Sequence, residues 1–368
     1  MRFVSAAFVL ALAWLAACSG TPLPPDAARW ETDNPLRPIG PPPLGIDINL
    51  RSLPVPPTPE RVRLGRWLFF DKRLSRDGTI SCASCHQPAH AFSQTTAVPT
   101  GVDGATGRRK VPTIVNLAIP NRWSSFKDAP VGAFFWDGRA RTLEAQALEP
   151  IAGPSEMGSS HATMVSTISR ASGYARYFTQ AFGDAKVTKE RVARAIADYE
   201  RTRMSGDSPF DRWRHGRGFV SDAVRRGFDL FADKAGCAAC HTPPLFTDGA
   251  FHNLGIGWNP ETTSFADEGR YAITKDTVFE GDPGSFKTPT LREVTRHAPY
   301  MHDGSLATLR DVIEFYNRGG IVNPDLDDRL RRRGPLRLTS AEVNDLVAFL
   351  VSLEGTGWQD KGPLMFPQ

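Results

Sequence analysis

Two copies of one five-residue motif constrain this 368-residue chain more than any other feature of its sequence. Residues 82–86 (CASCH) and 237–241 (CAACH) both follow the pattern Cys-x-x-Cys-His, the attachment motif of c-type haem. Two thiols at this spacing reach both vinyl groups of one porphyrin, and the adjacent histidine ligates the iron. The sequence therefore predicts two covalently bound haem c groups. The predicted attachment and iron-ligating residues are Cys82, Cys85, His86, Cys237, Cys240 and His241.

Two other sites use closely spaced cysteines, namely a zinc knuckle and a thioredoxin-like redox pair. The cysteine count argues against both. Of five cysteines, four form the two motifs and the fifth, Cys18, ends a secretory segment, so none remains for a disulfide or a further zinc ligand.

The N-terminal segment predicts export. Residues 3–17 form an apolar run after Met1-Arg2 that is too short to span a bilayer and is typical of a signal peptide. Small residues then precede Cys18, which resembles the bacterial lipoprotein signal, with residues 1–17 removed and Cys18 diacylated. An ordinary signal peptide with an incidental cysteine is the alternative. We expect a periplasmic protein, and Ser19 resembles the signal for anchorage at the outer membrane.

Proline is concentrated near the start of the mature chain. Twelve of the 30 prolines lie between residues 21 and 59. Such runs favour extended polyproline II, so residues 18–57 are predicted to form a semi-rigid stalk.

The remainder of the chain repeats itself once, with landmarks in the same order. Residues 65–69 (GRWLF), ahead of the first motif, correspond to 227–231 (GFDLF), and the Pro-Thr pair at 112–113 recurs at 289–290. Each half closes with an amphipathic helix, beginning after Thr188 and Thr339.

This repeat predicts a mainly α fold with two cytochrome c-like domains, each built around one haem. The expected segments are a first haem domain at 58–205, a linker at 206–217, a second haem domain at 218–355 and a tail at 356–368. The linker region is arginine-rich and is expected to be exposed. The formal charge of +4 would be cancelled by four haem propionates, so no nucleic-acid partner is inferred.

Four further segments resemble the bacterial dihaem cytochrome c peroxidase and MauG superfamily. They are residues 135–139 (FWDGR), 144–150 (EAQALEP), 154–158 (PSEMG) and 299–304 (PYMHDG). The resemblance covers about residues 58–355, nearly all of the chain beyond the signal and the stalk.

The resemblance implies roles for five residues near the haems. It places Glu156 and Gln146 above the first haem, with Pro150 shaping that pocket. A carboxylate there moves a proton between the two oxygens of hydrogen peroxide before the bond between them breaks. Trp136 is implied to lie between the haems, and His302 to lie near the second haem without ligating it.

The residue implied to ligate the second iron decides the branch of the superfamily. Tyr316 stands fourteen residues after His302, where peroxidases have methionine and MauG-like members have tyrosine. An ordinary core tyrosine is the alternative, since Tyr316 shares an apolar helix face. The loop from Ala91 to Gly107 also lacks the histidine that occupies the first iron in resting peroxidases, so that iron is expected to be open.

A calcium ion between the domains is also part of the resemblance. Its asparagine ligand is replaced here by Lys110, and a charged ammonium cannot donate a lone pair to a cation. Calcium is therefore doubtful, although backbone carbonyls near Pro299 remain available.

The predicted function is reduction of hydrogen peroxide by a periplasmic dihaem peroxidase, with electrons from a small cytochrome c or a cupredoxin. One alternative is MauG-like oxidation of a partner protein. Against it, the tryptophan that such enzymes carry just before the second motif is absent, with Ala235-Gly236 in its place. The other alternative is a dihaem electron carrier with no enzymatic activity.

Overall fold

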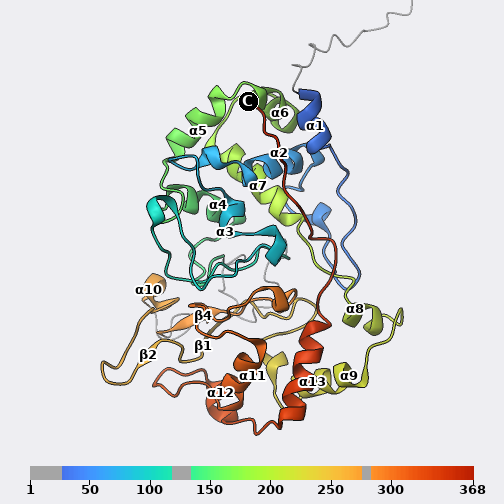
Figure 1. The fold of residues 1–368 in the computed structure, drawn as a ribbon, viewed down its shortest axis with the longest axis vertical. Coiled ribbons are helices and arrows are strands. Elements are labelled where there is room, and N and C mark those ends of the chain that lie inside the picture. Colours follow the sequence, from blue (N-terminus) through green and yellow to red (C-terminus); the bar gives the residue numbers. More distant parts are fainter. Residues whose placement is uncertain (1–26, 118–133, 276–282) are drawn as a thin grey trace, which may run out of the picture.

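The structure, a computed structural model, describes residues 27–117, 134–275 and 283–368 and is mostly helical, as predicted (Figure 1). The signal peptide, Cys18 and the start of the proline-rich segment lie outside these ranges. Within the described ranges, no helix is both long and apolar enough to cross a bilayer.

The first lobe, at the top of Figure 1, surrounds one hydrophobic core that includes Leu64, Trp67, Phe92, Ile196 and Tyr199. Its helices are α1 (Ala27–Asp33), α2 (Pro59–Phe70), α3 (Cys82–Cys85), α4 (Leu143–Ala152), α5 (His161–Arg170), α6 (Gly173–Phe182) and α7 (Lys189–Arg201), with 3-10 turns η1 (Leu50–Ser52), η2 (Lys72–Leu74), η3 (Pro88–His90) and η4 (Val102–Gly104).

The second lobe has its own core, which includes Phe231, Phe246, Val343, Leu346 and Phe349. Its helices are α8 (Pro209–Arg214), α9 (Asp222–Ala232), α10 (Tyr271–Thr274), α11 (Leu309–Asn317), α12 (Asp328–Arg333) and α13 (Ser340–Val351), with turns η5 (Cys237–Ala239) and η6 (Val294–Arg296). Two short antiparallel pairs join β1 (Phe251–Asn253) to β4 (Ser285–Lys287) and β2 (Trp258–Asn259) to β3 (Ser264–Phe265).

The sequence repeat corresponds to a repeated helix pair. In the first lobe α2 packs on α7, and in the second α9 packs on α13. Both crossings depend on a glycine, because a Cβ atom on Gly65 would lie 1.8 Å from the Ala195 carbonyl oxygen and one on Gly227 would lie 2.0 Å from that of Asp345. No side chain fits at either position.

The predicted helix starts are also found. Thr58 caps α2 ahead of Pro59, Thr188 caps α7, and Thr339 forms a capping box with Glu342. These caps satisfy backbone N–H groups that the first turn of a helix leaves free.

The prediction of a stalk is wrong for residues 27–57, which pack against the globule. Trp30 is buried in the first core, and Ile46, Ile48 and Leu50 form a small cluster with Met204 and Leu245. An extended segment exposes alternate residues to opposite sides, so the alternation of Ile46, Ile48 and Leu50 gives it one apolar face. That face covers the junction between the lobes, which offsets the entropy of ordering the segment.

The predicted tail also packs against the globule. Residues 356–368 leave the second lobe and run along the first, so that the C-terminus lies near α6 (Figure 1). Trp358 is buried in the first core, and Asp360 accepts hydrogen bonds from Arg66 at 2.7 and 2.8 Å. This C-terminal segment therefore connects the two lobes.

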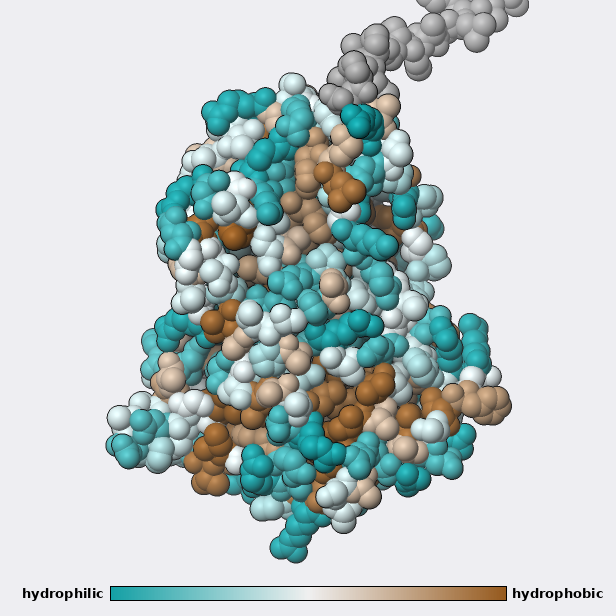
Figure 2. Space-filling model, viewed as in Figure 1, coloured by the Kyte–Doolittle hydropathy of each residue, from teal (hydrophilic) through white to brown (hydrophobic). Residues whose placement is uncertain are grey.

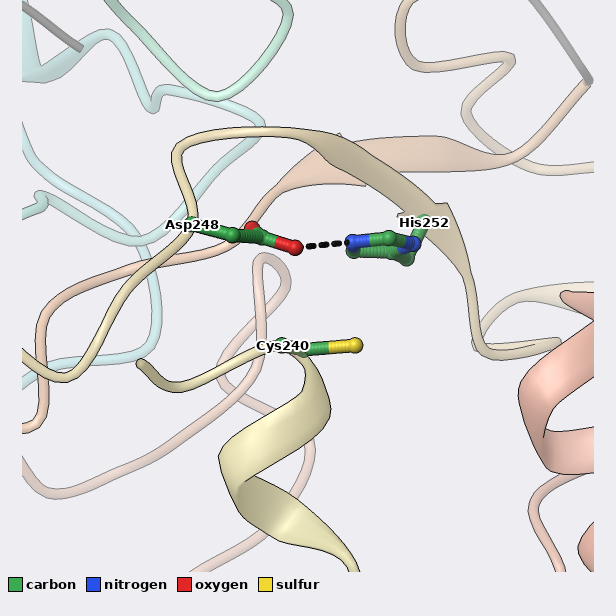
Figure 3. A group of neighbouring side chains, drawn as sticks. All are labelled: Cys240, Asp248 and His252. Atoms are coloured by element: carbon green, nitrogen blue, oxygen red, sulfur yellow. Dashed lines mark hydrogen bonds and ion pairs between the residues drawn. The ribbon is translucent and has the colours of Figure 1, made fainter. Parts of the chain in front are cut away.

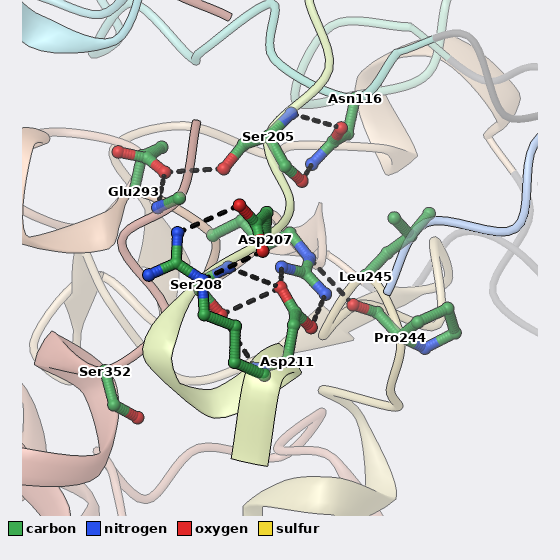
Figure 4. Close-up of polar contacts among 12 residues, drawn as sticks. Asn116, Ser205, Asp207, Ser208, Asp211, Pro244, Leu245, Glu293 and Ser352 are labelled. Atoms are coloured by element: carbon green, nitrogen blue, oxygen red, sulfur yellow. Dashed lines mark hydrogen bonds and ion pairs between the residues drawn. The ribbon is translucent and has the colours of Figure 1, made fainter. Parts of the chain in front are cut away.

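A buried polar network joins the lobes (Figure 4). Ser205 and Asn116 exchange two hydrogen bonds, at 2.9 and 3.2 Å, and the Ser205 hydroxyl donates to Glu293 at 2.5 Å. The predicted linker is therefore only partly exposed, because Phe210 and Asp211 are buried while the neighbouring arginines reach solvent.

The strongest link in this region is a buried ion pair. Arg292 is fully buried and donates to both carboxylate oxygens of Asp211, at 2.8 and 2.9 Å. Burial alone would raise the pKa of Asp211, but the hydrogen bonds from Arg292 and Ser208 hold it below its ordinary value.

Removing one partner of this pair should destabilise the protein strongly, because an unpaired charge stays buried. We expect Arg292→Met to lower the free energy of unfolding by about 3–5 kcal/mol in denaturant titration of the holo-protein. The matched control is Arg212→Met, which breaks an equally close but exposed pair with Asp207, at 2.9 Å, and should reduce the stability far less because solvent screens both charges. Equal losses in the two variants would contradict the assigned importance of burial.

On the face shown in Figure 2, hydrophobic residues come to the surface in both lobes, with the larger area over the second. Among the described residues, the most exposed large hydrophobic side chains are Phe219, Leu364 and Val322, at 94%, 86% and 82%. They belong to three separate segments and need no common explanation.

Candidate active site

One cavity of about 1550 Å³ lies between and within the two lobes. Every predicted site residue lines it, although the residues come from positions 82 to 316 of the chain. They are Cys82, Cys85, His86, Trp136, Gln146, Pro150, Glu156, Cys237, Cys240, His241, His302 and Tyr316. The fold thus brings the two motifs and the residues implied by the resemblance into one connected space.

The two motif histidines are held in the same way. Nδ1 of His86 donates to the Phe92 carbonyl at 3.0 Å, and Nδ1 of His241 donates to the Phe246 carbonyl at 2.9 Å. Because Nδ1 carries the proton, Nε2 keeps its lone pair. Burial lowers the pKa of both imidazoles, which keeps them neutral. This is the state and the orientation that iron ligation requires.

The repeated Pro-Thr pair explains why these loops have one shape. The Thr113 hydroxyl donates to the carbonyl of Ala91, and that of Thr290 donates to the carbonyl of Leu245, both at 2.6 Å. Ala91 and Leu245 directly precede Phe92 and Phe246, whose carbonyls accept the hydrogen bonds from the motif histidines. The threonine therefore fixes the loop on which the orientation of the histidine depends.

The cysteine environment fits thioether formation better than zinc binding. Burial raises the pKa of Cys85 to about 11 and that of Cys237 to about 12, and the negative charge of Glu156 adds to the rise at Cys85. Zinc ligands are thiolates, which need a lowered pKa. Each lobe contributes two cysteines and a neutral buried histidine to one large cavity, so the residues fit haem c.

A three-residue cluster beside the second motif resembles a metal site (Figure 3). It contains Cys240, Asp248 and His252, but its contacts are those of an ion-pair network. His252 lies 2.9 Å from Asp248 and 2.7 Å from Asp327, and although burial opposes the charge, these two carboxylates raise the pKa of His252 to about 11. An imidazolium cannot ligate a metal, and Cys240 belongs to the haem motif.

The polar residues of the first-haem pocket come from α4 and the turn after it. Gln146 lies within α4, and its side-chain oxygen is buried without a hydrogen-bond partner among the described residues. Pro150 is in the last turn of the same helix, and Gly153 ends it. A Cβ atom on Gly153 would lie 2.4 Å from a carboxylate oxygen of Glu156, so glycine leaves room for that side chain.

Glu156 has the environment of a proton-transfer group. Burial raises its pKa; the positive charge of Arg139 opposes this shift and the negative charge of Glu149 adds to it. A carboxyl group with a raised pKa can accept and release a proton closer to neutral pH than an exposed one.

Trp136 lies at the junction of the lobes. Its indole N–H donates to the Lys110 carbonyl at 2.7 Å, and its own carbonyl accepts from the backbone N–H of Lys287 at 2.8 Å. These two bonds come from opposite lobes, so they fix the indole within the shared cavity.

His302 is buried and lies flat against Phe286, with ring centroids 3.6 Å apart and 13° between the planes. Burial lowers its pKa to about 4, so the ring is neutral near pH 7. Like the other predicted site residues, it lines the shared cavity.

Tyr316 comes from α11 and faces the second motif. Burial raises the pKa of its phenol, and the nearby sulfurs of Cys240 and Cys237 add to that rise. Among the described residues, no hydrogen bond to the Tyr316 hydroxyl is found. The hydroxyl oxygen of Tyr316 is thus available to ligate a metal ion in the cavity.

Three titratable residues of the cavity with shifted pKa values were not predicted. Burial raises the pKa of Glu200 to about 8, and lowers that of Lys287 to about 8 and that of His297 to about 3. Glu200 gives a signal in the sequence, because it lies four residues after Ile196 on the apolar face of α7. Lys287 and His297 lie outside helices, so no helical periodicity in the sequence indicates their burial.

The residues around Lys110 do not fit calcium. Its ammonium donates to the carbonyls of Gln94, Thr96 and Ala298, in the place where the resemblance puts the ion. A cationic nitrogen at this point excludes a second cation.

The fold and the cavity define a class of protein, a mainly helical one in which two Cys-x-x-Cys-His motifs and a buried carboxyl group share one cavity. Residues 59–218 match the family described as di-haem cytochrome c peroxidase. The chain is 39% identical over 313 residues to methylamine utilization protein MauG of Methylophilus methylotrophus, which covers 84% of this chain and 87% of that protein. It is 33% identical to cytochrome c551 peroxidase of Nitrosomonas europaea, with 85% of each chain covered.

A solved structure of a MauG-like protein associated with microbial copper homeostasis is similar, with a TM-score of 0.70 and 31% identity over 89% of this chain and 97% of that one. The chain belongs to the dihaem cytochrome c peroxidase and MauG family, as the sequence predicted. It is accordingly a haem oxidoreductase of the peroxidase class.

Proposed function

We propose that this chain is a dihaem peroxidase that reduces hydrogen peroxide to two molecules of water, using two electrons and two protons. The first haem would be bound by Cys82 and Cys85 and ligated by His86, and the second would be bound by the corresponding residues of the second motif. The observation that carries the proposal is the meeting of both motifs with a buried carboxyl group, Glu156, in one cavity.

Haem c supplies, when bound, an iron at which peroxide is reduced. The protein supplies the proton. Glu156 would take a proton from one oxygen of the peroxide and return it to the other, so that water can leave. The unpartnered oxygen of Gln146 is available to orient the peroxide, and Pro150 narrows the pocket above it.

Electrons would reach the second haem from a small cytochrome c or a cupredoxin and pass by Trp136 to the first. The support is the position of the Trp136 indole, which is hydrogen bonded at the lobe junction and lines the shared cavity. An aromatic ring held rigidly between two redox centres shortens each transfer step.

A second candidate function is MauG-like oxidation of a partner protein. Tyr316 favours it, because a hard oxygen donor on the second iron would favour its oxidised states. The loop without histidine between Ala91 and Gly107 favours it too, and so does the 39% identity to MauG. Against it, Ala235-Gly236 stands where a tryptophan would be needed.

The test measures haem content and peroxide consumption on the purified holo-protein. We expect two haem c per chain and peroxide-dependent oxidation of a reduced small cytochrome. One haem per chain would contradict the dihaem assignment. Rapid reaction with peroxide but no oxidation of any cytochrome or cupredoxin would favour the second candidate, and no reaction with peroxide would favour the electron carrier.

We also propose that the protein is held at the outer membrane, facing the periplasm, by lipid on Cys18. The full-length protein should then partition into detergent, while Cys18→Ser should remain in the aqueous phase. Two acyl chains supply enough apolar surface for lasting attachment. Recovery of both forms in the soluble periplasmic fraction would overturn the lipoprotein assignment.

A further inference from the structure

A buried lysine lies at the junction of the two lobes. Lys110 is only 4% exposed, and its ammonium donates to the backbone carbonyl of Gln94, to that of Thr96 at 3.1 Å and to that of Ala298 at 3.4 Å. Gln94 and Thr96 belong to the first lobe, whereas Ala298 belongs to the second. The ammonium therefore bridges the lobes directly.

The partners of this charge are all carbonyl oxygens. Among the described residues, no carboxylate forms an ion pair with Lys110. Three converging carbonyls without a counter-ion are an arrangement that suits a hard cation. Burial lowers the pKa of Lys110 to about 8, so the group still carries most of its charge at pH 7. The neighbouring His297 is affected too, because burial first and the Lys110 charge second lower its pKa to about 3.

The backbone of Lys110 forms hydrogen bonds with two cavity residues, His302 and Trp136. The Lys110 N–H donates to the His302 carbonyl at 2.7 Å, and the Lys110 carbonyl accepts from the Trp136 indole at 2.7 Å. A shift of Lys110 would therefore move the indole that lies at the lobe junction.

We propose that the Lys110 ammonium occupies the cation site between the lobes permanently, so that this protein needs no calcium there. The positive charge is covalently attached and cannot be removed by a chelator. A calcium ion would be repelled by it and would lack the side-chain oxygen that an asparagine provides at this position.

The proposal does not depend on the peroxidase activity, and it is tested by calcium binding and thermal unfolding of the holo-protein. Wild type, Lys110→Asn and Lys110→Met are freed of calcium with EGTA, dialysed against calcium chloride and analysed for bound metal. Lys234→Met removes an exposed lysine paired with Glu342 and serves as the control.

We expect wild type and Lys234→Met to bind no stoichiometric calcium and to keep their unfolding midpoint in EGTA. Lys110→Met should unfold at a lower temperature that calcium does not restore, because buried carbonyls lose their partner. Lys110→Asn should bind roughly one calcium ion per chain and regain stability with it.

Three outcomes would overturn the proposal. Wild type could bind one calcium ion whose removal lowers its midpoint. Lys110→Met could unfold at the wild-type temperature. Lys110→Asn could fold without binding calcium, which would show that the carbonyls form no cation site. If neither variant folds, the wild-type measurements still decide whether calcium is needed.

Discussion

Replacing Glu156 with glutamine should slow the reaction with hydrogen peroxide about a hundredfold or more, the usual contribution of a general acid-base group. Glutamine keeps the size of the side chain but cannot carry a proton from one peroxide oxygen to the other. Both haems should stay attached, because Glu156 belongs to neither attachment motif. Stopped-flow kinetics of the holo-protein with peroxide measures the effect.

The matched control for this variant is Glu149→Gln. Glu149 is a nearby carboxylate that is exposed and paired with Arg139 at 2.7 Å, and it does not line the cavity. Its replacement should change the maximal rate little, although losing its negative charge should lower the pKa of Glu156 slightly. Unchanged kinetics in Glu156→Gln would remove Glu156 from the mechanism, and equal losses in both variants would indicate a general charge effect.

The wild-type rate should also depend on pH in a defined direction. The proton acceptor is the ionised carboxylate, and burial raises the pKa of Glu156. The rate should therefore fall as the pH falls through a midpoint above the ordinary pKa of a glutamate, and this limb should be absent from the profile of Glu156→Gln.

Replacing Tyr316 with methionine should raise the reduction potential of the second haem by about a hundred millivolts or more, within the ~0.8 V range that axial ligands span. A phenolate oxygen stabilises the ferric state, whereas a thioether sulfur stabilises the ferrous state. The variant should also turn over reduced cytochrome faster. Redox titration of wild type and variant provides the measurement.

Tyr316→Phe separates ligation from packing, because it removes only the hydroxyl. If Tyr316 ligates the iron, the absorption spectrum of the second haem in Tyr316→Phe should differ from that in the wild type. Equal second-haem potentials in wild type and Tyr316→Met would refute ligation and leave Tyr316 as a packed core residue.

Much of the site could be predicted because its chemistry is local in sequence. Cys82, Cys85 and His86 stand within five residues, and Thr58 and Thr339 mark helix starts by short-range capping. The sequence repeat also predicted the repeated helix pairs. Its glycines, Gly65 and Gly227, recur because each lies where a partner helix leaves no room for a side chain.

The errors arose where distant segments meet. Proline content suggested that residues 27–57 stand away from the globule, but the apolar face of Ile46 and Ile48 finds a surface made by Met204 and Leu245. The packing of the tail could not be predicted for the same reason, because Trp358 lies in a core built mostly from the first half of the chain. The composition of a segment does not show which distant residues will cover it, and its burial depends on those residues.

The buried charges show the same limit. The lack of an asparagine at Lys110 could be noticed from the resemblance, but the three carbonyls around its ammonium come from residues up to 188 positions away. The shifted pKa values of Lys287 and His297 likewise follow from burial, which only the folded chain creates.

The central claim is that the first haem iron is open to peroxide while the second is fully ligated. Electron paramagnetic resonance of the ferric holo-protein tests it most directly. Our account predicts one high-spin and one low-spin haem signal in equal amounts. Two low-spin signals would contradict it and would identify the protein as an electron carrier.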